Sequence, residues 1–133
     1  MKFYPISCNT GIIPRSISGT QPLSRLLIGM SEILIISTTD SLESAQAISI
    51  ALVESHEAAC ITIVPGIRSV YRWEGKLCNE GEFLLLIKSC SEKFEAVRRR
   101  IRQLHSYQVP EIIALPIVAG DSDYLAWLQS SLV

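Results

Sequence analysis

The sequence lacks the features that mark membrane proteins, metal centres and the common enzyme classes. None of its apolar runs approaches the roughly 20 residues of a membrane helix, so we expect no membrane partner. Only two histidines are present, and G-x-S-x-G, H-E-x-x-H and P-loop motifs are absent. The four cysteines, Cys8, Cys60, Cys78 and Cys90, follow no C-x-x-C or zinc-ribbon spacing. We therefore predict free thiols in a reducing compartment, no required cofactor and no enzymatic activity.

Acidic residues are missing from the first 31 positions, which hold three of the 12 basic residues. The rest of the chain thus carries nine basic and all 13 acidic residues, an excess of four negative charges. An acidic domain gives no reason to expect nucleic acid as a partner. An RNA-binding sheet also needs exposed aromatic residues on its central strands, where only Phe83 is available.

Residues 1–30 are predicted to be a flexible extension, and residues 31–133 the folded domain. Prolines and glycines break every helical or strand period in the extension. Its Ser- and Arg-containing, acid-free composition is similar to that of an organelle transit peptide. The alternatives are a plain disordered extension, or an upstream start with Met30 as the true initiator. We expect a cytoplasmic protein, or an organellar one if the extension is a transit peptide.

Apolar periodicity in the remainder predicts one α+β domain of ferredoxin-like topology. Its two main helices begin at capping-box spacings, Asp40 with Glu43 and Ser89 with Glu92. Asp121 is the predicted N-cap of an extra C-terminal helix. The predicted arrangement is a four-stranded antiparallel sheet with two helices on one face. The expected strands are residues 33–36, 58–64 continued by 68–73, 77–88 and 111–118, and the helices are residues 41–56, a stripe at 94–104, and 124–128.

The second and third strands form a long hairpin over residues 67–88. Pro65-Gly66 predicts a bulge or an edge strand, and Glu74-Gly75-Lys76 predicts the turn. Strands of about 14 residues exceed the usual five or six. Because one sheet face stays uncovered, we expect an oligomer to bury its apolar surface. Tyr71 and Trp73, near the hairpin tip, either pack within one subunit or anchor a subunit contact.

The segment His105-Ser106-Tyr107-Gln108-Val109-Pro110-Glu111 gathers a histidine, a tyrosine and a glutamate. His105 is either a metal ligand or a helix C-terminal residue that interacts with free carbonyls. The basic cluster Arg98–Arg102 either binds phosphate or forms a solvated helix face beside Glu92 and Glu95.

Five motifs stand in order along the chain: Ala58-Ala59-Cys60, Ser69-Val70-Tyr71-Arg72-Trp73-Glu74-Gly75-Lys76, Lys88-Ser89, the 105–111 segment and Asp121-Ser122-Asp123-Tyr124-Leu125-Ala126-Trp127-Leu128. Together they resemble the CutA family of divalent-cation tolerance proteins, over about residues 32–131. The resemblance implies a non-enzymatic ferredoxin-like homotrimer, associated with divalent metals and copper, that looks architecturally like PII signalling proteins. It places Tyr71, Trp73 and Glu74 at the trimer interface. It places Tyr107, Glu111, Lys88 and Trp73 in an intersubunit ligand cleft, and His105 at a metal site.

Two departures from the family pattern bear on metal binding. Ser37 stands where some members carry Cys, and Leu104-His105-Ser106-Tyr107 stands where some carry His-His-Pro-Tyr. Only His105 of such a copper site is retained, so we expect copper to bind weakly, if it binds. Two other functions stay open: a PII-like trimer that binds a small regulatory ligand without a metal role, and an acylphosphatase-like enzyme. The enzyme needs an anion-binding loop with an Arg after the first strand, where this chain has Ser37-Thr38-Thr39-Asp40.

Overall fold

A four-stranded antiparallel sheet carries the fold of residues 32–133, the part of the chain that the computed structural model describes. The strand order is β2-β3-β1-β4, and β1 pairs antiparallel with both β3 and β4. This order confirms the predicted ferredoxin-like topology. The predicted extension of residues 1–30, with Cys8, lies outside the described residues. The elements are β1 (Glu32–Thr39), α2 (Leu42–Glu54), β2 (Cys60–Trp73), β3 (Lys76–Cys90), a 3₁₀ turn (Ser91–Lys93), α3 (Phe94–Leu104), β4 (Ile113–Pro116) and α4 (Ser122–Ser130).

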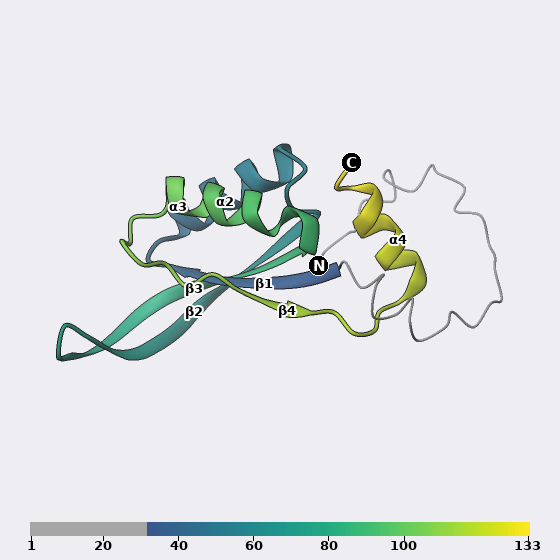
Figure 1. The fold of residues 1–133 in the computed structure, drawn as a ribbon. Helices are drawn as coiled ribbons and strands as arrows, with labels where there is room; N and C mark the ends of the chain where they lie inside the picture. The colour runs from purple at the N-terminus through teal and green to yellow at the C-terminus, as the bar shows by residue number, and fades with distance from the viewer. Residues whose placement is uncertain (1–31) are drawn as a thin grey trace.

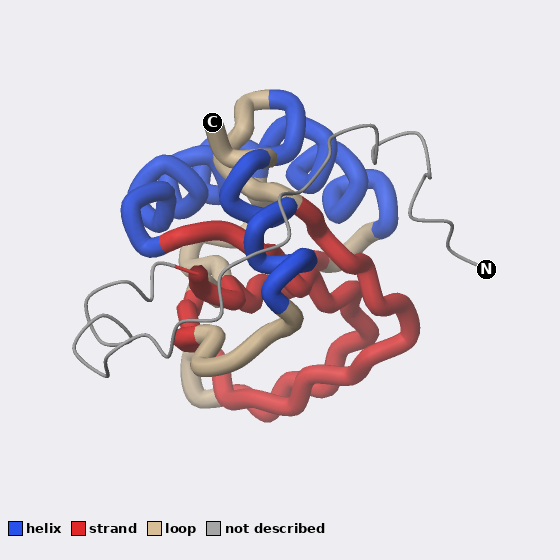
Figure 2. Tube along the Cα trace, turned by 90° about the vertical axis from the view of Figure 1, so that its right-hand side faces the viewer, coloured by secondary structure: helices blue, strands red, loops and turns tan. Residues whose placement is uncertain are grey.

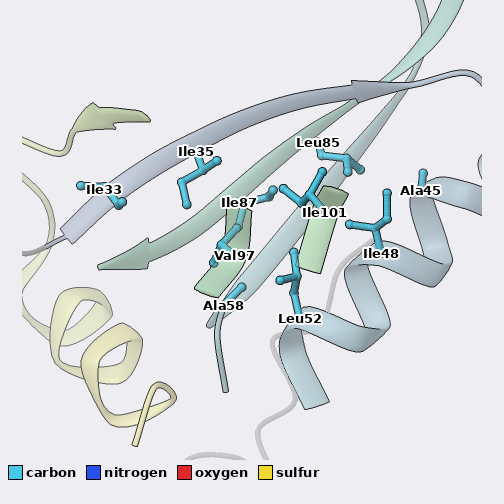
Figure 3. Close-up of a cluster of buried hydrophobic side chains, with 10 residues drawn as sticks. All are labelled: Ile33, Ile35, Ala45, Ile48, Leu52, Ala58, Leu85, Ile87, Val97 and Ile101. Carbon is cyan, nitrogen blue, oxygen red and sulfur yellow. The ribbon is translucent and has the colours of Figure 1, made fainter. Parts of the chain in front are cut away.

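Alternation along β1 and β3 puts the main core on one face of the sheet. Ile33, Ile35, Leu85 and Ile87 are buried and point towards α2 and α3, which cover that face (Figures 1 and 3). Each such side chain contributes about 1.5–3 kcal/mol when it is fully buried. The helices add the other half of this core, with Ala45, Ile48 and Leu52 from α2 and Val97 and Ile101 from α3.

The opposite face of the sheet is not covered by any helix within residues 32–133. Figure 2 shows α2 and α3 as a layer above the strands, with α4 in front of the strands at one end of the sheet. The intervening residues of the central strands, Leu34, Ile36, Leu84 and Leu86, are only half-buried. We call this surface the open face. It is the uncovered, apolar face that the sequence predicted.

The β2–β3 hairpin is as long as expected, with strands of 14 and 15 residues. Its register shifts between Val64 and Ile67, which confirms a bulge at Pro65-Gly66. At the tip, Glu74 and Gly75 have φ of 49° and 78°, as a type I′ turn requires. Because its strands are so long, the hairpin projects beyond the helices, at the end of the sheet away from α4 (Figure 1).

The predicted N-caps of both main helices were wrong, although the predicted stripe at residues 94–104 coincides with α3. Ser41, not Asp40, caps α2, because its backbone is extended and its Oγ accepts a hydrogen bond from the Ser44 N–H at 3.1 Å. Ser89 belongs to β3 and caps no helix. Its hydroxyl donates to the Glu57 carbonyl at 2.6 Å, and a 3₁₀ turn intervenes before α3.

The last strand and the last helix differ in how well they were predicted. β4 covers Ile113–Pro116 rather than 111–118, although the Ile117 N–H still donates to the Glu32 carbonyl at 3.1 Å beyond its end. Asp121 does cap α4, accepting from the Tyr124 N–H at 3.1 Å. α4 buries Leu128 against Ala59 and Cys90 in a second small core.

No helix in residues 32–133 is long and apolar enough to cross a membrane. The three cysteines within this range, Cys60, Cys78 and Cys90, are free thiols, as predicted.

Candidate functional site

A buried histidine anchors the segment that follows α3 to the end of β1. His105 is the C-cap of α3 and is only 9 % exposed. The Tyr107 N–H donates to its Nδ1 at 3.0 Å, so Nδ1 is the acceptor and Nε2 carries the proton. Nε2 lies 2.6 Å from the Thr38 carbonyl, to which it donates. Both ring nitrogens are therefore engaged by the backbone of this chain.

This anchoring directs Tyr107 onto the hairpin. The rings of His105 and Tyr107 are in contact, with centroids 4.6 Å apart. The Tyr107 hydroxyl donates to Oε2 of Glu82 on β3 at 2.9 Å. Burial, followed by the hydrogen bond to Glu82, raises the pKa of Tyr107 well above its ordinary value of 10. The phenol thus stays protonated near neutral pH and serves as a donor to the carboxylate.

A pocket of about 650 Å³ lies between this segment and the β2–β3 hairpin. Three aromatic side chains line it: Tyr71 and Trp73 from β2 and Tyr107 from the segment after α3. Two carboxylates, Glu82 and Glu111, also line it, and the other lining residues are uncharged. We call it the hairpin pocket. A concave, largely apolar site with a few polar groups is typical of small-molecule binding.

The predicted cleft residues fall into two places. Tyr107, Glu111 and Trp73 all line the hairpin pocket, so the structure brings these three together. Lys88 does not line it. The Lys88 Nζ donates to Thr62 Oγ1 at 2.7 Å and to the Leu86 carbonyl at 3.2 Å, further along β3.

The predicted interface residues lie at the far end of the hairpin. Tyr71 and Trp73 are 39 % and 44 % exposed, so neither is part of the core of this subunit. Glu74 is exposed in the turn itself. An exposed tyrosine and tryptophan near a hairpin tip are the kind of side chains that anchor protein contacts.

Glu82 is a candidate site residue that the sequence reasoning missed, since it lines the hairpin pocket. It is 4 % exposed, although it lies in a strand next to Phe83 and Leu84. A carboxylate is rarely buried without a partner. A glutamate at the start of the apolar run 83–87 was therefore the available signal.

No group of three or more His, Cys, Asp or Glu side chains in residues 32–133 is placed to hold a metal ion. From the sequence, His105 is a candidate metal ligand. In the structure both ring nitrogens of His105 form hydrogen bonds to the backbone. An incoming cation must displace the Tyr107 N–H or the Thr38 carbonyl to reach it.

Two of the arginines in the basic cluster of α3 form ion pairs. Arg98 pairs with Glu95 at 3.0 Å, and Arg100 forms a two-pronged contact with Glu57 at 2.9 and 3.0 Å. The Arg100 guanidinium holds the pKa of Glu57 below its usual range. These contacts favour a structural role over phosphate binding for this pair of arginines.

Comparison with known proteins identifies the relatives of this chain. The family model "CutA1 divalent ion tolerance protein" matches residues 33–131. The "Divalent-cation tolerance protein CutA" of Thermus thermophilus is 46 % identical over 77 % of this chain and 98 % of its own length. "Protein CutA, chloroplastic" of Arabidopsis thaliana is 41 % identical over 74 % of this chain and 54 % of its own.

The fold agrees with these matches. The crystal structure of CutA from Xylella fastidiosa superposes with a TM-score of 0.76 at 40 % identity, covering 77 % of this chain and 99 % of that one. The family model and the Thermus thermophilus relative are named for divalent-cation tolerance, and none of the relatives cited carries the name of an enzyme or of a PII protein. This chain therefore belongs to the CutA1 divalent ion tolerance protein family.

Proposed function

We propose that this protein acts in tolerance to divalent cations as a homotrimer and catalyses no reaction. Family membership supports the cation role, because the relatives are named for it. The open face of the sheet is the observation that supports assembly. A stable soluble chain rarely leaves an apolar surface of this kind in water.

The hairpin supports a closed ring of subunits over a simple face-to-face pair. β2 and β4 are the two free edges of the sheet, and they differ in length and sequence. A contact between two different edges is head-to-tail, and it forms a ring when the rotation closes. We propose a ring of three, with Tyr71, Trp73 and Glu74 of each hairpin at the contact.

Copper is the cation that we propose for the weak site at His105. Cu(II) heads the affinity order of the divalent first-row metals and accepts imidazole. Binding competes with the two hydrogen bonds of the ring, so it is weak, and it is not needed for the fold.

We propose a cytoplasmic location, with an organelle as the alternative. The acid-free N-terminus and the chloroplastic relative motivate the alternative. A fluorescent fusion to the C-terminus, expressed with and without residues 1–30, distinguishes the two.

Growth complementation tests the cation role. The chain is expressed in a bacterium that lacks its own family member, and growth is followed at increasing Cu(II). Wild-type protein should restore growth, and Trp73→Ala should restore less if the trimer is needed. Failure of the wild-type protein to restore growth, at an expression level equal to the native one, contradicts the proposed role.

A further inference from the structure

The hairpin pocket contains a buried acidic side chain that forms no ion pair with a basic residue within residues 32–133. Glu82 is 4 % exposed, and its Oε2 accepts one hydrogen bond from Tyr107. A neutral phenol stabilises a carboxylate but does not cancel its charge. In the described part of the chain no lysine, arginine or histidine lines the pocket, and Glu111 adds a second carboxyl group. A buried carboxylate is stabilised by an opposite charge, so a positively charged ligand is the kind that fits this pocket.

Aromatic side chains give the pocket its second recognisable property. Tyr71, Trp73 and Tyr107 line the same cavity as the two carboxylates. The faces of aromatic rings attract cations, and cages of such rings bind quaternary ammonium groups in other proteins. In a single subunit 44 % of Trp73 is exposed, and this surface is shared between the pocket and the proposed subunit contact.

The same residues fit a bare metal ion poorly. Metal ions with oxygen ligands require several carboxylates or carbonyls around one point. In the described part of the chain no three ligating side chains meet. Moreover, about 650 Å³ is far more room than a single ion fills, and it suits a small organic molecule.

We propose that the hairpin pocket binds an organic ammonium cation, with Glu82 as its charge partner and Tyr71, Trp73 and Tyr107 around it. This inference rests on the proposed function in one respect: in the proposed trimer a neighbouring subunit would border the open side of the pocket. It adds a ligand class that is separate from the divalent cations.

Choline and its uncharged carbon analogue, 3,3-dimethyl-1-butanol, form a matched pair of probes. Each is titrated into the full-length protein labelled with ¹⁵N at tryptophan, and the two indole N–H signals are followed by NMR. Trp73 lines the pocket. Trp127 lies on α4 at the other end of the sheet and serves as the internal control (Figure 1).

Choline should shift the Trp73 signal saturably and leave the Trp127 signal in place. The uncharged analogue should bind at least tenfold more weakly. Glu82→Gln, which keeps the shape but removes the charge, should weaken choline binding about tenfold, whereas Glu54→Gln on α2 should leave it unchanged. If Glu82→Gln does not fold, Glu111→Gln is used, with a smaller expected loss.

Equal binding of choline and its analogue overturns the proposal, as does unchanged affinity in the folded glutamate variants. It is also overturned if neither choline nor tetramethylammonium shifts Trp73 at tens of millimolar. Sedimentation velocity on the same samples reports the oligomeric state. A trimer that does not bind choline refutes this inference alone. A monomer that binds choline refutes only the proposed assembly.

Discussion

Two buried serines should respond in opposite ways to the same substitution. Ser37 and Ser89 are both fully buried, in β1 and β3. The Ser89 hydroxyl donates to the Glu57 carbonyl at 2.6 Å, whereas Ser37 Oγ has no hydrogen-bond partner within residues 32–133. A buried polar group without a partner costs about 1–3 kcal/mol, and a typical buried hydrogen bond contributes about 1 kcal/mol.

Replacing each serine by alanine should therefore change the free energy of unfolding in opposite directions. Ser37→Ala removes an unpaired hydroxyl without opening a large cavity, so the free energy of unfolding should rise by about 1 kcal/mol. Ser89→Ala strips the Glu57 carbonyl of its donor and should lower it by about 1–2 kcal/mol. For a domain of about 100 residues, 1 kcal/mol corresponds to a shift of roughly 4 °C in melting temperature.

Denaturation in guanidinium chloride, followed by circular dichroism, measures both variants. All samples are compared at one protein concentration, because assembly adds to apparent stability. The reasoning is refuted if Ser37→Ala destabilises the protein as much as Ser89→Ala does.

Three further predictions concern Glu57, His56 and His105. The pKa of Glu57 is lower in the folded state than in the unfolded state. Its contribution to stability is therefore complete above the ordinary value of 4.5 and is lost as pH falls through the lowered pKa. Glu57→Gln should remove this pH dependence and flatten the acid unfolding curve in that range, and an unchanged curve contradicts the prediction. His56 has a φ of 58°, a backbone conformation that glycine adopts freely and alanine does not. Both His56→Gly and His56→Ala lose the contact with the Ser131 carbonyl, so the glycine variant should be about 1 kcal/mol more stable than the alanine variant. Equal melting temperatures of the two variants refute this. Calorimetric titration with Cu(II) should show weak binding that disappears in His105→Ala, and nanomolar binding that survives would move the site to the cysteines.

The sequence was sufficient to predict the architecture because each element carried a local signal. The apolar run of β1, the Pro65-Gly66 bulge and the Glu74-Gly75 turn follow from rules that act over a few residues. The predicted N-cap of α3 was wrong because a 3₁₀ turn without a side-chain cap precedes that helix, and the N-cap of α2 was wrong because two polar residues compete for the position. Ser41 lies one residue after Asp40, and only the backbone geometry decides which of them caps α2.

The pocket was predicted only in part because its residues come from distant segments. Tyr107, Glu111 and Trp73 were proposed from the motifs, but the bond between Tyr107 and Glu82 spans 25 residues and depends on the register of β3. That register is set by the bulge and the turn together. The buried surroundings of His105 were equally invisible, because its main contact, the Thr38 carbonyl, lies 67 residues away.

Assembly is the central claim, and the mass of the native protein tests it most directly. Native mass spectrometry, with sedimentation velocity at micromolar concentration, is applied to the full chain and to Trp73→Ala, with Trp127→Phe as a control away from the hairpin. We predict a species of three times the 14.7 kDa chain mass for wild type and the control, and partial dissociation for Trp73→Ala. A wild-type protein that is monomeric at these concentrations would contradict the account.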